Sequence, residues 1–251
     1  MKNAIGIDIG GTGIKGALVN LKKGELVTER LRFDTPDGGK PASVVELVIK
    51  LVKQIDAPKN TPIGICFPAP VKNGVTLSAA NVSNEWIGLQ AGKLFSKALG
   101  TEIVMLNDAD AAGVAEIKFG AGQDRKGLVL MCTLGTGIGT ALFMNGKLIP
   151  NTELGHIEID GVDYETKAAY SAKARDNLSF EQWAKVLSKY FDRLNRLFYP
   201  DLIIIGGGVS KEHESFLHLI ESDVEIVAAR SKNNAGIIGA AYFAAKHLSK
   251  D

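Results

Sequence analysis

The sequence predicts an α/β fold made of two similar domains, each a mixed sheet flanked by helices. Apolar stretches of strand length alternate along the chain with stretches in which apolar residues recur at helical spacing. The octet Gly11-Thr-Gly-Ile-Lys-Gly-Ala-Leu also returns as Gly135-Thr-Gly-Ile-Gly-Thr-Ala-Leu, with six of eight positions identical. Both copies end one apolar stretch and open another, which indicates an internal duplication. We therefore expect two domains that face each other across a cleft, each with a glycine turn.

The first half of the chain begins with a predicted β-hairpin. Residues 4–20 form two apolar stretches joined by glycines, which is typical of two antiparallel strands and their turn. A third strand is expected over 25–33, and apolar residues recur at helical spacing over 41–55. The elements expected next are a strand at 62–67, a helix at 89–99, a strand at 103–106 and a helix at 109–119.

The second half repeats the alternation of strands and helices. Ser179 and Gln182 form a capping-box pattern ahead of a long apolar helical face, and Pro200 ends that helix. A buried strand then leads into Gly206-Gly-Gly, and a last helix is expected over 233–248. The predicted domains are a small N-terminal domain, 1–108, and a large C-terminal domain, 109–239, with a C-terminal helix at about 240–251 that packs back on the small domain.

Charge and cysteine content exclude several classes of protein. The formal net charge is +1, so no global field attracts nucleic acid or an anionic membrane, and a polyanion must be held by a local cluster. Cys66 and Cys132 lie in apolar stretches without metal-site spacing, which favours buried thiols in a reducing compartment. No signal-peptide core and no apolar stretch of membrane-spanning length is present, so we expect a cytoplasmic protein without a membrane partner.

The glycine turns suit phosphate binding, because glycine lets the backbone approach a phosphate with its amide groups toward the oxygens. Asp8 precedes the first turn, where its carboxylate suits a hydrated Mg²⁺ ion. Each turn alone also fits an ordinary tight hairpin, and the pairing of the two favours a phosphate clamp. The residues expected to bind the phosphoryl donor are Asp8, Gly10, Gly11, Thr12, Gly13, Lys15, Gly135, Thr136, Gly137, Gly206, Gly207 and Gly208.

Asn107 and Asp108 stand where a predicted strand ends and a predicted helix begins. Ligands collect at the carboxyl ends of strands in sheets of this kind. A carboxylate at a helix N-terminus is kept ionised by the helix dipole, which suits a general base. The alternative is that one of these residues only caps the helix.

Glu153, His156 and Glu165 place two carboxylates and an imidazole within thirteen residues. Polar groups that converge in this way suit the hydroxyls of a sugar. The alternative is a structural histidine beside solvated carboxylates, among them Glu158 and Asp160.

Taken together, these residues resemble the ROK family of sugar kinases, named for repressors, open reading frames and kinases. The resemblance runs from Gly6 to Gly239 and implies an actin/hexokinase-like, ribonuclease-H-like fold. The stretches that carry it are Gly6-Ile-Asp-Ile-Gly-Gly-Thr-Gly-Ile-Lys, Ala80-Asn-Val-Ser-Asn-Glu-Trp-Ile-Gly, Asn107-Asp-Ala-Asp-Ala-Ala, Gly135-Thr-Gly-Ile-Gly, Glu153-Leu-Gly-His and Gly206-Gly-Gly-Val-Ser.

The resemblance implies that Asp108 is the base that activates the attacking hydroxyl, with Mg²⁺ as cofactor. It also implies a set of residues that hold sugar hydroxyls, namely Asn81, Asn107, Glu153, His156 and Glu165. Many members follow the histidine with a cysteine-rich zinc motif, whereas 157–165 contains no cysteine here, so zinc is not expected. That departure weakens the assignment of Glu165.

The short chain, the absent zinc motif and the stretch that begins at Asn81 resemble the branch that uses polyphosphate, ATP or both to phosphorylate glucose and, in some members, mannose. We therefore expect transfer of a phosphoryl group to the sugar 6-hydroxyl, and the resemblance is compatible with a homodimer. Alternatives are a kinase for another hexose or an amino sugar, an actin-like ATPase, and a sugar-sensing regulator. Residues that could bind a polyphosphate chain are Lys118, Arg125, Lys126, Lys15 and Lys211, each of which also fits an ordinary solvated surface.

Overall fold

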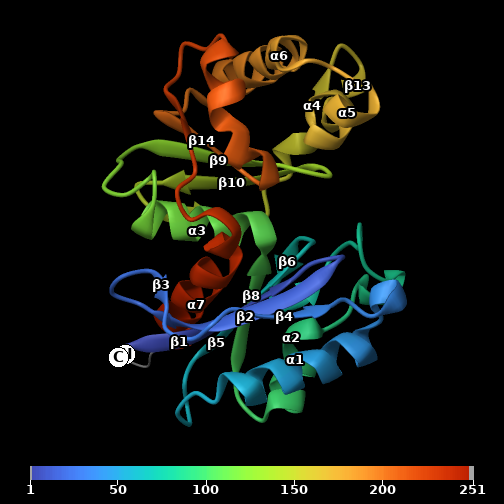
Figure 1. Cartoon of the computed structure of the whole chain (residues 1–251), viewed down its shortest axis with the longest axis vertical. Helices are drawn as coiled ribbons and strands as arrows, with labels where there is room; N and C mark the ends of the chain where they lie inside the picture. The colour runs from blue at the N-terminus through green and yellow to red at the C-terminus, as the bar shows by residue number, and fades with distance from the viewer. Residues whose placement is uncertain (1, 249–251) are drawn as a thin grey trace. The chain divides into compact units, whose positions relative to one another are not determined.

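The computed structural model of the protein describes residues 2–248, and these form two compact units (Figure 1). Unit 1 runs up to Ala115 and resumes at Asn234, whereas unit 2 comprises Glu116–Asn233. The division falls inside a continuous helix, α3 (Asp108–Phe119), whereas the sequence placed the boundary at Asp108. The last three residues of the helix expected at about 240–251 lie outside the described residues.

Unit 1 is built on a six-stranded sheet in the order β3-β2-β1-β5-β8, with β4 also paired to β2. β1 and β2 form the antiparallel hairpin predicted from the sequence, and β1, β5 and β8 run parallel to one another. The strands are β1 (Asn3–Ile9), β2 (Gly13–Asn20), β3 (Glu25–Leu26), β4 (Leu31–Asp34), β5 (Ile63–Phe67) and β8 (Ile103–Asn107). A separate two-stranded ribbon joins β6 (Val71–Lys72) to β7 (Val75–Thr76).

The single strand expected over 25–33 is wrong, because the segment forms two short strands, β3 and β4. Thr28 lies between them, and its hydroxyl accepts the backbone N–H of Leu18 at 3.1 Å. A side chain thus takes the hydrogen bond that a strand backbone would have made, and strand pairing is interrupted there.

The helices of unit 1 cover its sheet. α1 (Pro41–Ile55) begins with proline at a position where no N–H is needed, and its apolar face is buried. α2 (Ala91–Leu99) begins two residues later than expected. α7 (Ala235–Leu248) lies directly on β1, β5 and β8 (Figure 1), and a Cβ at Gly6 would stand 1.8 Å from the carbonyl oxygen of Ile237. Glycine at that position therefore sets the close approach of α7 to β1.

Unit 2 contains a five-stranded sheet in the order β11-β10-β9-β14-β15, in which β9 and β10 form the second hairpin. Its strands are β9 (Leu128–Leu134), β10 (Ile138–Met144), β11 (Lys147–Ile149), β14 (Leu202–Gly206) and β15 (Ile226–Ala228), and β12 (Glu158–Ile159) pairs with β13 (Val162–Asp163) outside this sheet. Its helices are α4 (Glu165–Ala168), α5 (Tyr170–Arg175) and α6 (Phe180–Phe198).

The sequence pattern predicts both α6 and the hydrogen bonds at its N-terminus. The capping box is confirmed, since the Ser179 hydroxyl accepts the Gln182 N–H at 3.2 Å and the Gln182 side chain accepts the Ser179 N–H at 2.9 Å. The apolar face of α6 is buried in the core of unit 2, where Trp183 donates its indole N–H to the carbonyl oxygen of Ala168. That bond ties α6 to α4, the helix that begins at Glu165.

Short 3-10 helices connect these elements: η1 (Asp37–Gly39), η2 (Asn84–Trp86), η3 (Leu154–His156), η4 (Gly208–Ser215), η5 (Leu217–Leu219) and η6 (Lys232–Asn234). Among the helices of the described chain, none is both long enough and apolar enough to span a membrane.

Candidate active site

The first glycine turn joins β1 to β2 at the carboxyl end of β1. Ile9 and Ile14 form the last cross-strand pair, and the N–H of Gly10 donates to the carbonyl oxygen of Gly13 at 3.0 Å. Two side chains, one on β4 and one just after it, fix the turn from outside. The Thr35 hydroxyl donates to the carbonyl oxygen of Gly10 at 2.6 Å, and Arg32 donates to that of Thr12 at 3.2 Å.

Asp8 lies at this end of β1, between a cation and a thiol. Its Oδ2 is 3.2 Å from the Nζ of Lys15, the residue opposite it on β2, and its Oδ1 is 3.4 Å from the Sγ of Cys66 on β5. Burial raises the pKa of Cys66 well above its ordinary value, and the charges of Asp8 and Asp108 raise it further. The thiol therefore stays protonated and donates to Asp8.

Asn107 and Asp108 end β8 and begin α3, as the sequence predicted. The buried Asn107 side chain accepts the N–H of Ala109 at 2.8 Å and that of Asp110 at 3.2 Å, so it caps the helix. Asp108 is half-buried and also accepts the N–H of Ala109, at 2.7 Å. The capping alternative therefore describes Asn107 well, while Asp108 is a carboxylate at a helix N-terminus, where the dipole favours its ionised form.

Asn81 lies against the first glycine turn. A Cβ at Gly11 would stand 2.7 Å from both the Cβ and the carbonyl oxygen of Asn81. Only glycine allows this approach. Unit 1 thus brings a predicted sugar residue next to the predicted donor turn.

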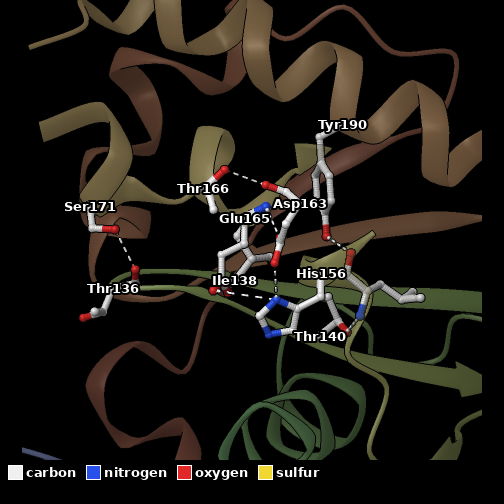
Figure 2. A network of polar contacts seen from close by, with 10 residues as sticks. Thr136, Ile138, Thr140, His156, Asp163, Glu165, Thr166, Ser171 and Tyr190 are labelled. Carbon is white, nitrogen blue, oxygen red and sulfur yellow. Dashed lines mark hydrogen bonds and ion pairs between the residues drawn. The ribbon is translucent and has the colours of Figure 1, made fainter. Parts of the chain in front are cut away.

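The second glycine turn, between β9 and β10, is held by α5 (Figure 2). The N–H of Gly135 donates to the carbonyl oxygen of Gly137 at 3.0 Å. Ser171 contributes two bonds, from its N–H to the carbonyl oxygen of Gly135 and from its hydroxyl to that of Thr136 at 2.6 Å.

The third glycine run lies beside the second turn. Gly207 has a φ of 84°, and a Cβ there would stand 2.3 Å from the carbonyl oxygen of Leu134, the residue that precedes the second turn. Gly206 pairs with Thr133 across the parallel strands β14 and β9. Two of the three predicted donor segments therefore meet at the carboxyl ends of neighbouring strands in unit 2.

His156, Glu165 and Asp163 form a polar cluster close to the second turn (Figure 2). The Oε2 of Glu165 accepts the backbone N–H of Ile138 at 2.7 Å. The Nδ1 of His156 is 3.0 Å from Oδ2 of Asp163 and 4.0 Å from Oε1 of Glu165. Glu165 therefore contacts both the backbone after the glycine turn and the surroundings of the imidazole.

Glu153 is placed by buried hydroxyl groups. The Oγ1 of Thr140 accepts the N–H of Leu154 at 3.0 Å and donates to the carbonyl oxygen of Thr152 at 2.7 Å, which fixes both neighbours of Glu153. Partial burial raises the pKa of Glu153, the positive charge of His156 opposes that shift, and Glu165 adds to it. The carboxyl group of Glu153 thus lies in electrostatic reach of the two other predicted sugar residues of unit 2.

The basic residues considered for polyphosphate lie at the surface. Arg125 pairs with Glu225 at 2.7 Å, and Lys118, Lys126 and Lys211 are exposed. Within the described residues, no group of three or more histidine, cysteine, aspartate or glutamate side chains is placed to hold a metal ion.

Sequence reasoning missed several residues that hold the predicted ones in place. They share no motif of their own, and their contacts depend on how the chain folds back on itself. They are Thr35, Arg32 and Cys66 in unit 1 and Thr140, Asp163 and Ser171 in unit 2.

Comparison with known proteins assigns the chain to a family. The model described as "ROK family" matches residues 4–170. The chain belongs to the ROK family. Among its relatives is a protein named polyphosphate glucokinase from Mycobacterium leprae, 43% identical over 237 residues, which are 94% of this chain and 72% of that protein.

Solved ROK structures share the fold. The crystal structure of an inorganic polyphosphate/ATP-glucomannokinase from Arthrobacter sp. strain KM superposes with a TM-score of 0.92 at 46% identity, over 98% of this chain and all (100%) of that one. A ROK family glucokinase from Streptomyces griseus, solved in complex with glucose and AMPPNP, gives a TM-score of 0.83 at 25% identity over 97% and 99% of the two chains. The predicted actin/hexokinase-like α/β class and the predicted family are confirmed.

Proposed function

We propose that this chain is a hexose kinase that transfers a phosphoryl group from polyphosphate or ATP to the 6-hydroxyl of glucose. The observation that carries the proposal is the placement of Asp108, a half-buried carboxylate at the N-terminus of α3 whose charge reaches the surroundings of Asp8. An ionised carboxylate in that position suits a base that takes a proton from an attacking hydroxyl. The names of the relatives in the family support the same reaction.

In this proposal the acceptor sugar is held by carboxylate, amide and imidazole groups. Asn81 and Asn107 serve in unit 1, and Glu153, His156 and Glu165 serve in unit 2. Capping of α3 uses Oδ1 of Asn107, so in this proposal its Nδ2 group is the one that serves a hydroxyl. Hydroxyl groups both donate and accept, so a mixed set of amide, carboxylate and imidazole suits them.

The donor is held by backbone amides of the three glycine segments. Gly10, Gly11, Thr12 and Gly13 form one, and 135–137 and 206–208 form the two that lie side by side in unit 2. Backbone amides in such turns can point at phosphate oxygens, and positioning supplies much of the catalysis of phosphoryl transfer.

The residues beside the first glycine turn suit a Mg²⁺ ion that keeps most of its water ligands, rather than one enclosed by protein ligands. Asp8 is a single carboxylate beside the first turn, and no three-residue metal cluster exists among the described residues. Mg²⁺ keeps several waters and takes one or two carboxylates together with substrate phosphates. When bound, the ion would neutralise charge on the donor, while Lys15 orients Asp8. We place the reaction in the cytoplasm, which the free buried thiols Cys66 and Cys132 favour.

The test is a matrix of acceptors and donors with the purified protein. Glucose, mannose, N-acetylglucosamine and N-acetylmannosamine are each offered with ATP and with polyphosphate, and the product is identified by its enzymatic oxidation or by mass spectrometry. Glucose 6-phosphate formed at a higher kcat/KM than any other product supports the proposal. Preference for an amino sugar would favour the alternative kinase. Glucose binding without turnover on either donor would favour a sugar-sensing regulator.

A further inference from the structure

Asp163 occupies the junction between the histidine and the glutamate of unit 2. It ends β13, two residues before Glu165, and its two carboxylate oxygens have different partners. Oδ2 faces Nδ1 of His156 at 3.0 Å, and Oδ1 accepts the N–H of Glu165 at 3.2 Å. The backbone carbonyl of Asp163 accepts the hydroxyl of Thr166 at 2.6 Å, which fixes the residue further (Figure 2).

We propose that Asp163 is a positioning residue for the sugar site, because it fixes the ring orientation and the tautomer of His156. An ionised carboxylate only accepts hydrogen bonds, so Nδ1 of His156 must carry a proton to bond with it. Nε2 of the neutral ring is then an acceptor and is directed away from Asp163. This inference rests on the proposed function, in which His156 binds a sugar hydroxyl.

The groups around the His156 ring are mostly carboxylates, and they favour a protonated Nδ1. The hydrogen bond to Asp163 raises the pKa of His156, partial burial opposes the shift, and the charges of Glu165, Asp163 and Glu153 raise it further. These three carboxylates are the charged groups that act on the ring. The hydrogen bond to Asp163 has the largest effect, so its removal lowers the pKa of His156.

A purely structural role for Asp163 is the alternative. Its Oδ1 accepts the N–H of Glu165, the first residue of α4, and that contact alone would explain the residue as one that only caps the start of the helix from one position outside the N-cap residue, Tyr164. The two roles use different oxygens, so they can be separated. In Asp163→Asn the amide oxygen keeps the bond to the Glu165 N–H, and the amide nitrogen then faces His156 as a donor. The cap survives and the tautomer of His156 is reversed.

Asp160→Asn is the matched control. Asp160 lies in the same β12–β13 hairpin, pairs with Lys189 and does not contact His156. Its φ of 55° is tolerated by asparagine, so the substitution removes one surface carboxylate of the same hairpin without backbone strain. Any effect of the lost negative charge alone appears in both variants.

The experiment measures glucose affinity, steady-state kinetics and the pKa of His156 in the wild type, Asp163→Asn and Asp160→Asn. In Asp163→Asn we expect glucose affinity to fall about tenfold, as for one lost hydrogen bond, with KM rising more than kcat falls. The pKa of His156 is read from the pH titration of its ring signals in a two-dimensional ¹H–¹⁵N spectrum, assigned with His156→Gln, and we expect it to fall. The same spectrum reports the tautomer. Asp160→Asn should leave all three quantities unchanged.

The outcomes separate this inference from the proposed function. If His156→Ala weakens glucose binding and Asp163→Asn does not, Asp163 is only a cap and the inference is overturned. An unchanged tautomer and pKa in Asp163→Asn also overturn it. If His156→Ala itself leaves glucose affinity unchanged in a folded protein, the proposed sugar site is wrong. Should Asp163→Asn fail to fold, Asp163→Glu is measured in its place, and we expect it to keep the wild-type tautomer with intermediate affinity.

Discussion

The two glycine hairpins share a backbone pattern and differ in charge. In the first hairpin Asp8 lies opposite Lys15, and the two form an ion pair. In the second hairpin the corresponding pair is Thr133 and Gly139, joined by a neutral hydrogen bond of 3.3 Å. The duplicated octet departs from identity at the position of Lys15, so one of its two differences removes this charge.

The other difference changes what packs against the hairpin. In the first copy Gly16 lies against α1, where a Cβ would stand 2.5 Å from the side chain of the buried Leu51. The corresponding Thr140 of the second copy is buried and bonds to Thr152 and Leu154 on either side of Glu153. The turns differ in length too, with four residues between Ile9 and Ile14 and three between Leu134 and Ile138.

These differences indicate that the two hairpins serve different purposes. The hairpin of unit 1 carries the ionic groups suited to metal and proton chemistry. The hairpin of unit 2 is neutral and is tied, through Glu165 and Thr140, to the residues proposed to bind the sugar. Each variant below removes a group from one of the two units, so that the effects in unit 1 and unit 2 can be compared.

The largest effect is expected from Asp108→Asn in unit 1. The amide keeps the hydrogen bond to the N–H of Ala109 but cannot accept a proton, so turnover should fall by about 100-fold to 10,000-fold. Glucose affinity, measured by calorimetry without donor, should remain close to that of the wild type. A variant that keeps more than about a tenth of the wild-type kcat would contradict the base assignment.

A smaller effect is expected from Asp8→Asn, with Thr133→Val as its counterpart in the second hairpin. Loss of the carboxylate should raise the Mg²⁺ concentration for half-maximal rate roughly tenfold to hundredfold, as for a lost interaction with a charged group. Thr133→Val should leave that concentration unchanged, because this position carries no charge. Equal effects in both variants would mean that the hairpins do not differ in function.

Gly137→Ala tests the link between the second turn and Glu165. A Cβ at Gly137 would stand 2.5 Å from Oε2 of Glu165, so the side chain must move and its bond to the N–H of Ile138 is lost. Because the end of a side chain can move, we expect little change in the melting temperature and about a fivefold to tenfold loss of glucose affinity. Gly135→Ala, where no atom lies within 4 Å of the added Cβ, is the control for glucose binding measured without donor. Unchanged affinity in Gly137→Ala would show that Glu165 is not needed in its observed position.

The sequence correctly predicted those elements that depend on a local pattern of residues. Hairpins, the helix at 41–55 and the capping box at Ser179 follow from periodicity and turn chemistry, and all three are present. The contact of Asp163 with His156 depends instead on how the short β12–β13 hairpin returns to η3, and no motif encodes that return. The contact of Thr35 with Gly10 likewise joins two residues that lie just beyond the ends of β4 and β1, 25 positions apart in the chain.

Because 157–165 contains no cysteine, the sequence names no partner for His156 in that segment. The structure places a carboxylate there, from Asp163. The strand expected over 25–33 failed for a related reason, because the hydroxyl of Thr28 competes with the backbone for Leu18. Side-chain hydrogen bonds that no sequence motif encodes therefore account both for the missed positioning residues and for the wrong strand.

The smallest effect on activity is expected when basic residues on the surface of unit 2 are replaced. Arg125 and Lys126 follow α3, and both side chains are exposed. Arg125 already pairs with Glu225, and an exposed ion pair contributes little to stability, so Arg125→Ala combined with Lys126→Ala should leave the fold intact. If polyphosphate runs along this surface beyond the reacting phosphate, its KM should rise about twofold to fivefold while the KM for ATP stays unchanged.

Measuring the same KM values at several salt concentrations makes the test more specific. The Debye length falls to about 10 Å at 0.1 M salt, and interactions between exposed charges are screened beyond that distance. The wild-type KM for polyphosphate should rise more steeply with salt than that for ATP, and the double variant should lose part of this dependence. Lys22→Ala with Lys23→Ala in unit 1 is the matched control, since both lysines are exposed and Lys23 pairs with Glu25 at 3.9 Å. A loss of polyphosphate use in both double variants would indicate a general charge effect. A loss confined to the unit 1 variant would move the polyphosphate path to the turn between β2 and β3, where Lys22 and Lys23 lie.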